Sequence, residues 1–142
     1  MRIRTLLLSL FNHRTLAFMR WDIHFVWVRF LNMLTFQEEK LSRSIEKRES
    51  PIFLNLGSGP RGLDSPSWIN VDGYMDTNVH YCMDFTRTFP FPDNCFHGIF
   101  CEHVIEHFTQ EQGLVFLKEC LRILRPEGSI RIIIPDGEKV MR

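Results

Sequence analysis

The chain lacks several features that would mark a specialised class of protein. Basic and acidic residues are equal in number, 17 of each, so the excess of positive charge expected of a dedicated nucleic-acid-binding protein is missing. No two of the four cysteines are spaced as C-x-x-C, which disfavours both a zinc ribbon and a redox motif. We therefore predict no nucleic-acid partner, and cysteines that are buried in a reducing compartment such as the cytoplasm.

Glycine and proline are missing from the first 50 residues, whereas residues 51–142 contain all eight glycines and all seven prolines. This contrast predicts a helical extension over residues 1–50 and a separate globular domain over residues 51–142. The apolar run Leu6–Phe11 is not followed by the small residues of a secretory cleavage site, which disfavours a signal peptide. The lack of acidic residues before Asp22 leaves an organellar transit peptide open.

Long uninterrupted apolar runs are also absent. The aromatic-rich segment over residues 15–36 contains charged side chains such as Asp22 and Arg29, which a transmembrane helix tolerates poorly. We predict a helix in this segment. Its partner is either the rest of the chain or, through residues 1–36, a membrane surface or another subunit. A second, more polar helix is predicted over Gln37–Glu49.

Residues 51–142 alternate short apolar segments with turns. Five strands are predicted, at residues 52–56, 68–71, 79–83, 98–101 and 129–134. Their continuous apolar character is typical of a parallel sheet that is buried on both faces.

One helix between the last two strands is well specified. Thr109 and Gln112 have the spacing of a capping box at its start. Pro126 and Gly128 are expected to end it. The predicted apolar face consists of Leu114, Leu117, Leu121 and Leu124.

A glycine-rich loop follows the first predicted strand. Gly57–Gly62 matches G-x-G-x-x-G, the dinucleotide-binding pattern. Asp72 ends the next strand, where a carboxylate can accept both hydroxyls of a ribose. Only 12 residues separate Leu56 from Ile69, which is near the minimum length for such a crossover. This leaves little room for a helix that would hold a pyrophosphate, so a ligand with a ribose but no diphosphate is favoured over NAD.

Four stretches of the second region resemble the class I S-adenosylmethionine-dependent methyltransferases, and in particular their type 11 group. The stretches are Leu54–Pro60, Trp68–Asp72, Phe89–Phe96 leading to Glu102–His107, and Leu121–Gly128. The resemblance implies a Rossmann-like α/β fold, with a parallel sheet in the strand order 3-2-1-4-5 and helices on both faces. It also implies the cofactor S-adenosylmethionine and methyl transfer to an oxygen or nitrogen atom of a small-molecule or glycan-like acceptor.

The resemblance further implies which residues contact the cofactor. These residues are Gly57, Ser58, Gly59, Asp72, Asp84, Phe85, Glu102 and His103. Asp72 would hold the ribose hydroxyls, Asp84 would face the adenine amine, and Phe85 would lie against the adenine ring. A turn position for Asp84 and a core position for Phe85 stay open as alternatives.

The segment His103–His107 allows two interpretations. In the methyltransferase interpretation, His107 or Glu106 removes a proton from the acceptor. The same residues also match H-x-x-E-H, a zinc-hydrolase pattern in which two histidines share one metal ion. That pattern requires a helix, whereas here a predicted strand runs directly into it. We therefore predict no bound metal.

The sequence also departs from the resembling family. Asn55 and His97 stand where acidic residues are usual, and Glu127 replaces a glycine. We expect His97 to cost a structural hydrogen bond. The family fold normally continues beyond the fifth strand, so the strand ending at Ile134 is expected to be an apolar edge.

Another copy of the chain, as in a homo-oligomer, or the N-terminal helices could cover this edge. We favour the third alternative, a chain that is incomplete at its C-terminus and therefore a poor catalyst. A non-catalytic cofactor-binding or scaffold protein of the same fold is the alternative function.

Overall fold

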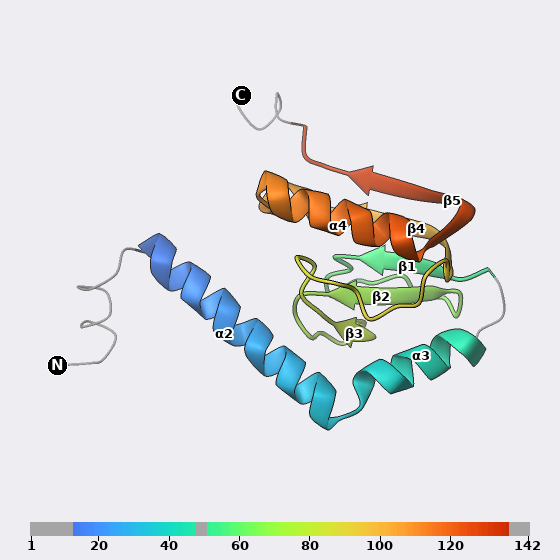
Figure 1. The fold of residues 1–142 in the computed structure, drawn as a ribbon, viewed down its shortest axis with the longest axis horizontal. Helices are drawn as coiled ribbons and strands as arrows, with labels where there is room; N and C mark the ends of the chain where they lie inside the picture. The colour runs from blue at the N-terminus through green and yellow to red at the C-terminus, as the bar shows by residue number, and fades with distance from the viewer. Residues whose placement is uncertain (1–12, 48–50, 137–142) are drawn as a thin grey trace. The chain divides into compact units, whose positions relative to one another are not determined.

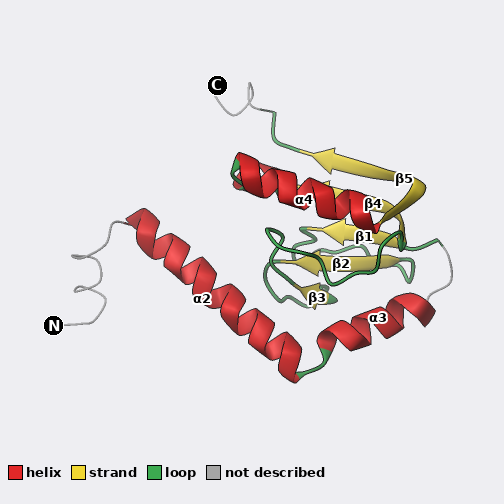
Figure 2. Cartoon of the chain, viewed as in Figure 1, coloured by secondary structure: helices red, strands yellow, loops and turns green. Residues whose placement is uncertain are grey.

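The computed structural model describes residues 13–47 and 51–136, with side chains from Asp22 onward. The helices and strands are α2 (His13–Leu34), α3 (Gln37–Lys47), β1 (Phe53–Leu56), β2 (Trp68–Asp72), β3 (Tyr81–Cys82), β4 (Phe96–Glu102), the 3-10 turn η1 (Ile105–His107), α4 (Gln110–Ile123) and β5 (Leu124–Ile133) (Figures 1 and 2). The chain divides into two compact units, residues 1–35 and residues 36–142.

The first unit contains α2, a helix of 22 residues. Among the described residues, no helix combines the length and the apolar character needed to cross a membrane. The second unit begins earlier than the sequence contrast at Pro51 suggests. The cause is α3, whose side chains Leu41 and Ile45 are buried in the core of that unit.

The second unit is built on one parallel sheet. Its five strands lie in the order β3-β2-β1-β4-β5, and every neighbouring pair is parallel. The predicted strand order is thereby confirmed. β4 and β5 are longer than predicted and β3 is only two residues long.

One face of this sheet carries the hydrophobic core. Strand residues such as Leu54, Ile69 and Ile99 are buried there, together with side chains of both α3 and α4. Three phenylalanines, Phe85, Phe89 and Phe116, meet edge to face within this core. Such aromatic pairs contribute about 0.5–1.5 kcal/mol beyond the burial of their surface.

The opposite face carries a different set of side chains. Because side chains alternate along a strand, Phe53, Asn55, Trp68 and Asn70 point away from the core. Phe53 and Trp68 stack at 5.1 Å, and the two asparagines are buried under the crossover between β1 and β2.

The sequence predicted helices on both faces of the sheet. Within the described part of residues 36–142, α3 and α4 instead join the same core. The crossover between β1 and β2, residues 57–67, folds as a loop that takes the place of a helix on the other face. Its length is near the minimum for a connection between parallel strands that includes a helix.

Helix α4 confirms its predicted start and corrects its predicted face. Both hydrogen bonds of the capping box between Thr109 and Gln112 are present. Of its four predicted apolar residues, Leu117 packs against the core and Leu124 is buried, whereas Leu114 and Leu121 are 53% and 66% exposed. The buried side chains of this helix are Phe116, Cys120 and Ile123.

The end of α4 also differs from the prediction. The helix ends at Ile123, and the chain continues at once into β5. Pro126 and Gly128 therefore lie within the irregular first part of β5, where Glu127 adopts a positive φ of 67°.

Candidate functional site

The carboxyl ends of β1, β2 and β4 meet at one edge of the sheet. The strand register pairs Leu56 with Val71 on one side and with Cys101 on the other. The loop after β1 therefore lies between Asp72 and Glu102. This is also where the strand order reverses, because the chain continues from β1 to β2 and later returns to β4 on the opposite side. Open α/β sheets bind ligands at such a point.

The glycine loop is fixed tightly at this edge. Gly57 and Gly59 have positive φ values of 74° and 57°, which glycine adopts without strain. The backbone N–H groups of Gly57 and Ser58 donate to the carbonyl of Val71, at 2.9 and 3.1 Å. A Cβ at position 57 would collide with Val104, whereas a Cβ at position 59 would meet nothing within 4 Å. The loop is thus packed at Gly57 and open at Gly59, where a ligand can approach the backbone.

Asp72 connects the glycine loop to the end of β2. Its Oδ2 accepts the N–H of Gly59 at 2.8 Å, and its Oδ1 accepts the N–H of Tyr74 at 3.0 Å. An ionised carboxylate has about four acceptor positions. Asp72 can therefore keep both bonds and still accept two further donors, such as a pair of hydroxyls.

Tyr74 is a candidate residue that the sequence analysis missed. Its side chain is half exposed and lies two residues beyond Asp72. An exposed ring at this place can stack against a flat aromatic ligand. Its position directly after the acidic strand end was the signal that could have identified it.

The buried side-chain amides of Asn55 and Asn70 hold the crossover between β1 and β2. Asn55 donates from Nδ2 to Oδ1 of Asn70 at 3.1 Å. Asn70 in turn accepts the N–H of Leu63 and donates to the Leu63 carbonyl, at 2.9 and 3.0 Å. Asn55, one of the departures from the family pattern, therefore holds Asn70 and through it the loop that follows the glycines.

A second cluster of polar residues follows β4. His103 has a positive φ of 55°, and its N–H donates to the carbonyl of Ile133. Its Nδ1 lies 3.1 Å from Oε1 of Glu106. Val104 packs beside Gly57, so this segment directly neighbours the glycine loop.

The helix required by the zinc interpretation is not formed. His103 follows the strand directly, while Glu106 and His107 lie in the short turn η1. In the part of the chain that the structure describes, no three His, Cys, Asp or Glu side chains are grouped to hold a metal ion. That the protein binds no zinc stays a prediction, which elemental analysis of the purified protein would test.

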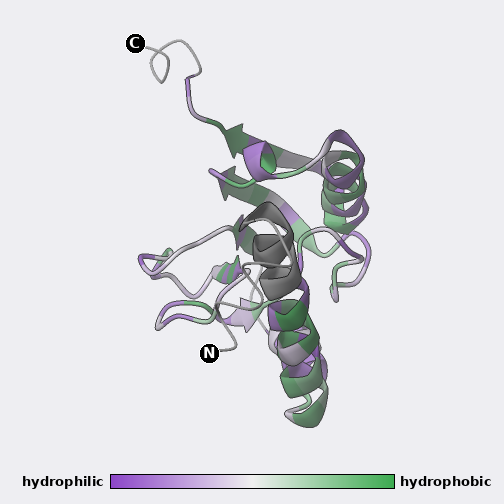
Figure 3. Ribbon diagram, turned by 90° about the vertical axis from the view of Figure 1, so that its left-hand side faces the viewer, coloured by the Kyte–Doolittle hydropathy of each residue, from purple (hydrophilic) through white to green (hydrophobic). Residues whose placement is uncertain are grey.

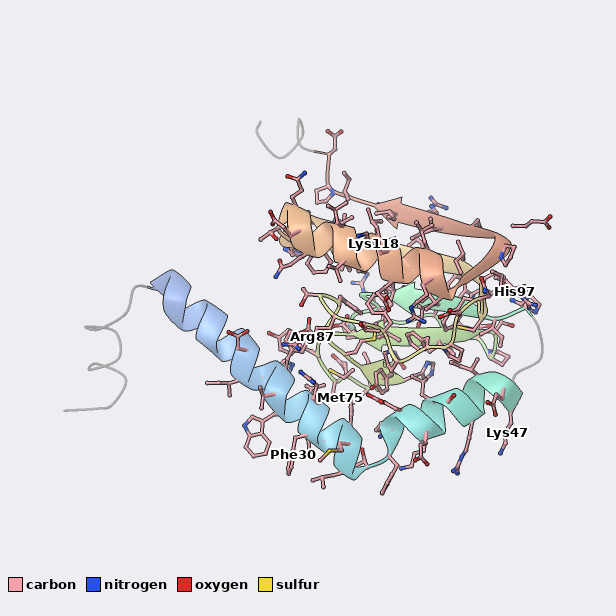
Figure 4. The ribbon with its side chains drawn as sticks, viewed as in Figure 1. Phe30, Lys47, Met75, Arg87, His97 and Lys118 are labelled. Atoms are coloured by element: carbon pink, nitrogen blue, oxygen red, sulfur yellow. The ribbon has the colours of Figure 1, made fainter. Side chains whose placement is uncertain are left out.

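Asp84 lies in a turn and Phe85 lies in the hydrophobic core. Oδ1 of Asp84 accepts from the N–H and the hydroxyl of Thr86, and its Oδ2 lies 3.2 Å from Nε of Arg87 (Figure 4). Phe85 is buried against Phe89 and Phe116. The two alternatives left open from sequence, a turn and a core position, describe these surroundings.

His97, which we expected to cost a structural hydrogen bond, contacts the residue just before β1. Its Nδ1 accepts the N–H of Ile52 at 3.2 Å, just before β1 begins (Figure 4). Nε2 of the same ring lies 2.9 Å from Arg125. Arginine can only donate, so both contacts need an accepting ring nitrogen, and a neutral ring has only one. The backbone N–H of His97 also donates to the carbonyl of Ile52 at 2.9 Å, and this bond anchors β1 whichever contact the ring keeps.

The segment Phe89–Phe96, which leads from β3 into β4, is held by Arg122 of α4. Its two terminal nitrogens donate to the carbonyls of Phe89 and Phe91, each at 2.9 Å. The guanidinium also pairs with Glu119 and Asp93. These bonds fix the loop that leads into β4, and so they position the strand whose end carries His103.

Residues 65–132 match the family model described as the methyltransferase domain. The matched segment, 68 of the 142 residues, is similar to the methyltransferase domain family. The match extends from the first crossover into β5 and includes Asp72 and the His103–His107 segment. No curated protein matches the chain significantly. The methyltransferase domain confirms the resemblance seen in the sequence and, in general terms, supports methyltransferase activity.

Proposed function

We propose that the methyltransferase domain binds S-adenosylmethionine at the carboxyl edge of its sheet. We further propose that it transfers the methyl group to an oxygen or nitrogen atom of a small-molecule or glycan-like acceptor. The observation that carries this proposal is the hydrogen bond between Gly59 and Asp72. It joins an open glycine backbone to a carboxylate that retains acceptor positions.

The residues at this edge fit a cofactor with a ribose and no diphosphate. Gly59 faces open space, so its backbone permits close approach. Asp72 has acceptor capacity for two ribose hydroxyls beyond its two backbone donors. The crossover forms no helix whose N-terminus would hold a pyrophosphate. When bound, S-adenosylmethionine supplies a methyl group on a sulfonium that is already reactive.

We assign the proton transfer to His103, with Glu106 as a positioning residue. The sequence placed this role on His107 or Glu106, but in the structure Glu106 pairs with His103. A proton on Nδ1 of His103 is donated to Glu106, which leaves Nε2 as a base for an acceptor hydroxyl. His103 is also strained. A non-glycine residue at positive φ costs about 1–3 kcal/mol, and such strain is concentrated at functional sites.

The experiment compares histidine variants of the full chain. Calorimetry with S-adenosylhomocysteine measures binding, and a panel of hydroxyl and amine acceptors measures methyl transfer. His103→Gln should lower transfer to hydroxyl acceptors by about 100-fold or more, a much larger effect than its effect on binding. Glu106→Gln should give a smaller loss, and His107→Gln serves as the comparison.

Three outcomes discriminate between the proposals. A wild-type chain that does not bind S-adenosylhomocysteine would refute the proposed function. A loss confined to His107→Gln would return the proton transfer to the residue expected from sequence. Tight binding without transfer to any acceptor would favour the alternative, a non-catalytic cofactor-binding protein.

A further inference from the structure

Helix α2 carries an exposed apolar stripe over its described side chains. Seven large apolar side chains are between 45% and 65% exposed, namely Ile23, Val26, Trp27, Phe30, Leu31, Met33 and Leu34. Figure 3 colours the ribbon by hydropathy, and Phe30 is labelled in Figure 4. Ile23, Trp27, Phe30 and Leu34 follow one another at spacings of 4, 3 and 4. This spacing places them on one side of the helix.

No charged residue belongs to this stripe. Large continuous apolar surfaces are rare on soluble proteins and mark places of interaction. The aromatic side chains Trp27 and Phe30 meet edge to face at 6.0 Å near its centre. Tryptophan in particular is enriched where one end of a side chain is apolar and the other is hydrated, as at a membrane surface.

The charge of the chain is divided unevenly around this helix. Residues 1–35 contain five arginines and a single acidic residue, Asp22. Residues 36–142 contain the remaining 12 basic and 16 acidic residues. The first unit is therefore cationic and the second anionic, although the whole chain is neutral. Such asymmetry is typical of proteins that bind an anionic surface through one part.

We propose that α2 lies in the interfacial layer of an anionic lipid membrane, with its apolar stripe among the acyl chains. Arg29 would contact lipid phosphates, since arginine side chains extend readily from the apolar boundary to the headgroups. The helix lies on the membrane and does not cross it.

The same charges argue against a second copy of the chain as the occupant. Pairing two α2 stripes would bring two cationic segments together, and like charges repel each other. An anionic lipid surface instead offers opposite charge to the arginines and an apolar interior to Trp27 and Phe30. The proposal is independent of methyl transfer, and it can fail or hold whatever the domain catalyses.

The test is flotation of the full chain with lipid vesicles. The wild type should float with vesicles of phosphatidylcholine and phosphatidylglycerol, bind pure phosphatidylcholine only weakly, and be released by high salt. Replacing both aromatics, Trp27→Ser with Phe30→Ser, should weaken binding about tenfold or more. The matched control is Leu114→Ser with Leu121→Ser, which removes two comparably exposed apolar side chains from α4. Circular dichroism checks that each variant is folded.

Several results would overturn the proposal. One is a wild-type chain that stays with neither kind of vesicle. Another is equal binding to neutral and anionic vesicles, which would remove the role of the arginines. A control variant that loses binding as much as the Trp27 and Phe30 variant would show that the stripe is not the contact. Sedimentation showing a wild-type dimer that the Trp27 and Phe30 variant dissociates would identify a second copy as the occupant.

Discussion

Asp72 combines two tasks in one side chain. Its carboxylate holds the backbone of Gly59 and Tyr74, and it retains the capacity to accept ligand hydroxyls. Asp72→Ala should weaken binding of S-adenosylhomocysteine by about 1.5–3 kcal/mol, the range for hydrogen bonds to a charged group. Asp72→Asn, which keeps one acceptor oxygen, should lose less. The measurement is calorimetry, with the exposed Asp64→Asn as the matched control. Unchanged affinity in a folded Asp72→Ala protein would remove this residue from the site.

Arg122 stabilises the fold through several hydrogen bonds made by one side chain. It satisfies two loop carbonyls and two carboxylates at once. Arg122→Met should lower the free energy of unfolding by about 1–3 kcal/mol, because it leaves partly buried acceptors without donors. The exposed Arg131→Met should change it by less than about 0.5 kcal/mol. Urea denaturation measures both. Equal small effects would show that water replaces the guanidinium without cost.

The same cluster predicts a pH dependence. The Arg122 guanidinium, donating to Glu119, holds the pKa of that carboxyl below its ordinary value of 4.5. A carboxyl with a depressed pKa in the folded state stabilises the fold above its unfolded pKa, and this contribution is lost as pH falls through the folded pKa. Wild-type stability should therefore fall below about pH 4.5 more steeply than that of Glu119→Gln. If the pair of Arg122 and Glu119 contributed nothing, denaturation curves would show the same loss of unfolding free energy between pH 6 and pH 3 in the wild type and in Glu119→Gln.

At the scale of elements, local signals were reliable where a single interaction decides the structure. The capping box needs only Thr109 and Gln112, and the sequence shows both. Two of the four residues predicted for the buried face of α4, Leu114 and Leu121, were misjudged because apolar residues occur almost all around this helix. The spacing of Leu114 and Leu121 is as regular as that of Phe116 and Ile123, and the choice between the two stripes is made by contacts with the sheet. Periodicity alone does not contain that information.

This difference gives a direct test of the buried face. Phe116 is fully buried and touches three other aromatic rings. Phe116→Ala should destabilise the protein by about 3–5 kcal/mol, through lost burial and a residual cavity. Leu121→Ala, on the stripe favoured by spacing, should cost less than about 0.5 kcal/mol. Thermal or chemical denaturation would distinguish them, and a larger effect for Leu121 would restore the leucine face.

The candidate site, too, was predictable from the sequence only in part. Gly57, Gly59 and Asp72 were identifiable because a glycine loop followed by an acidic strand end is a short pattern in the chain. The pairing of His103 with Glu106 was not, since it depends on a positive φ at His103 and on a turn in place of a helix. The support given by Asn70 was hidden too, because its partners Asn55 and Leu63 are brought to it only by the fold.

At the scale of the whole molecule, the strand order was predicted from the resemblance to the methyltransferases, and the structure has that order. The prediction of helices on both faces of the sheet was not met within the described part of residues 36–142, because a crossover can form a helix only if it has enough residues beyond those needed to connect its strands. The loop between β1 and β2 leaves the face with Phe53 and Trp68 without a helix in the described part of residues 36–142. The core on the other face buries Cys101 and Cys120 along with the aromatic cluster, and a third buried cysteine, Cys82, lies outside that core cluster.

Those cysteines make stability depend on alkaline pH. Cys82, Cys101 and Cys120 are at most 2% exposed. Burial, reinforced by Asp72 at Cys82 and by Glu106 at Cys101, raises their pKa from 9.0 to about 11 and about 12. Burial raises the pKa of Cys120 as well. In the unfolded chain these thiols lose protons near pH 9, whereas in the folded protein they retain them. Protonation therefore favours the folded state below pH 9, and that advantage is lost as pH rises from about 9 towards 12.

The expected loss can be measured against a variant with one thiol fewer. Between pH 8 and pH 10 each of these buried thiols should lower the free energy of unfolding by about 1 kcal/mol, since the unfolded form is about ten times more ionised at the higher pH. Cys101→Ala, although less stable at pH 8, should therefore lose about 1 kcal/mol less than the wild type over this interval. Lysine and tyrosine titrations are common to both proteins and cancel in the comparison. Identical losses in the two proteins would mean that Cys101 ionises as readily in the folded chain as in the unfolded one, and that the core admits water at the end of β4.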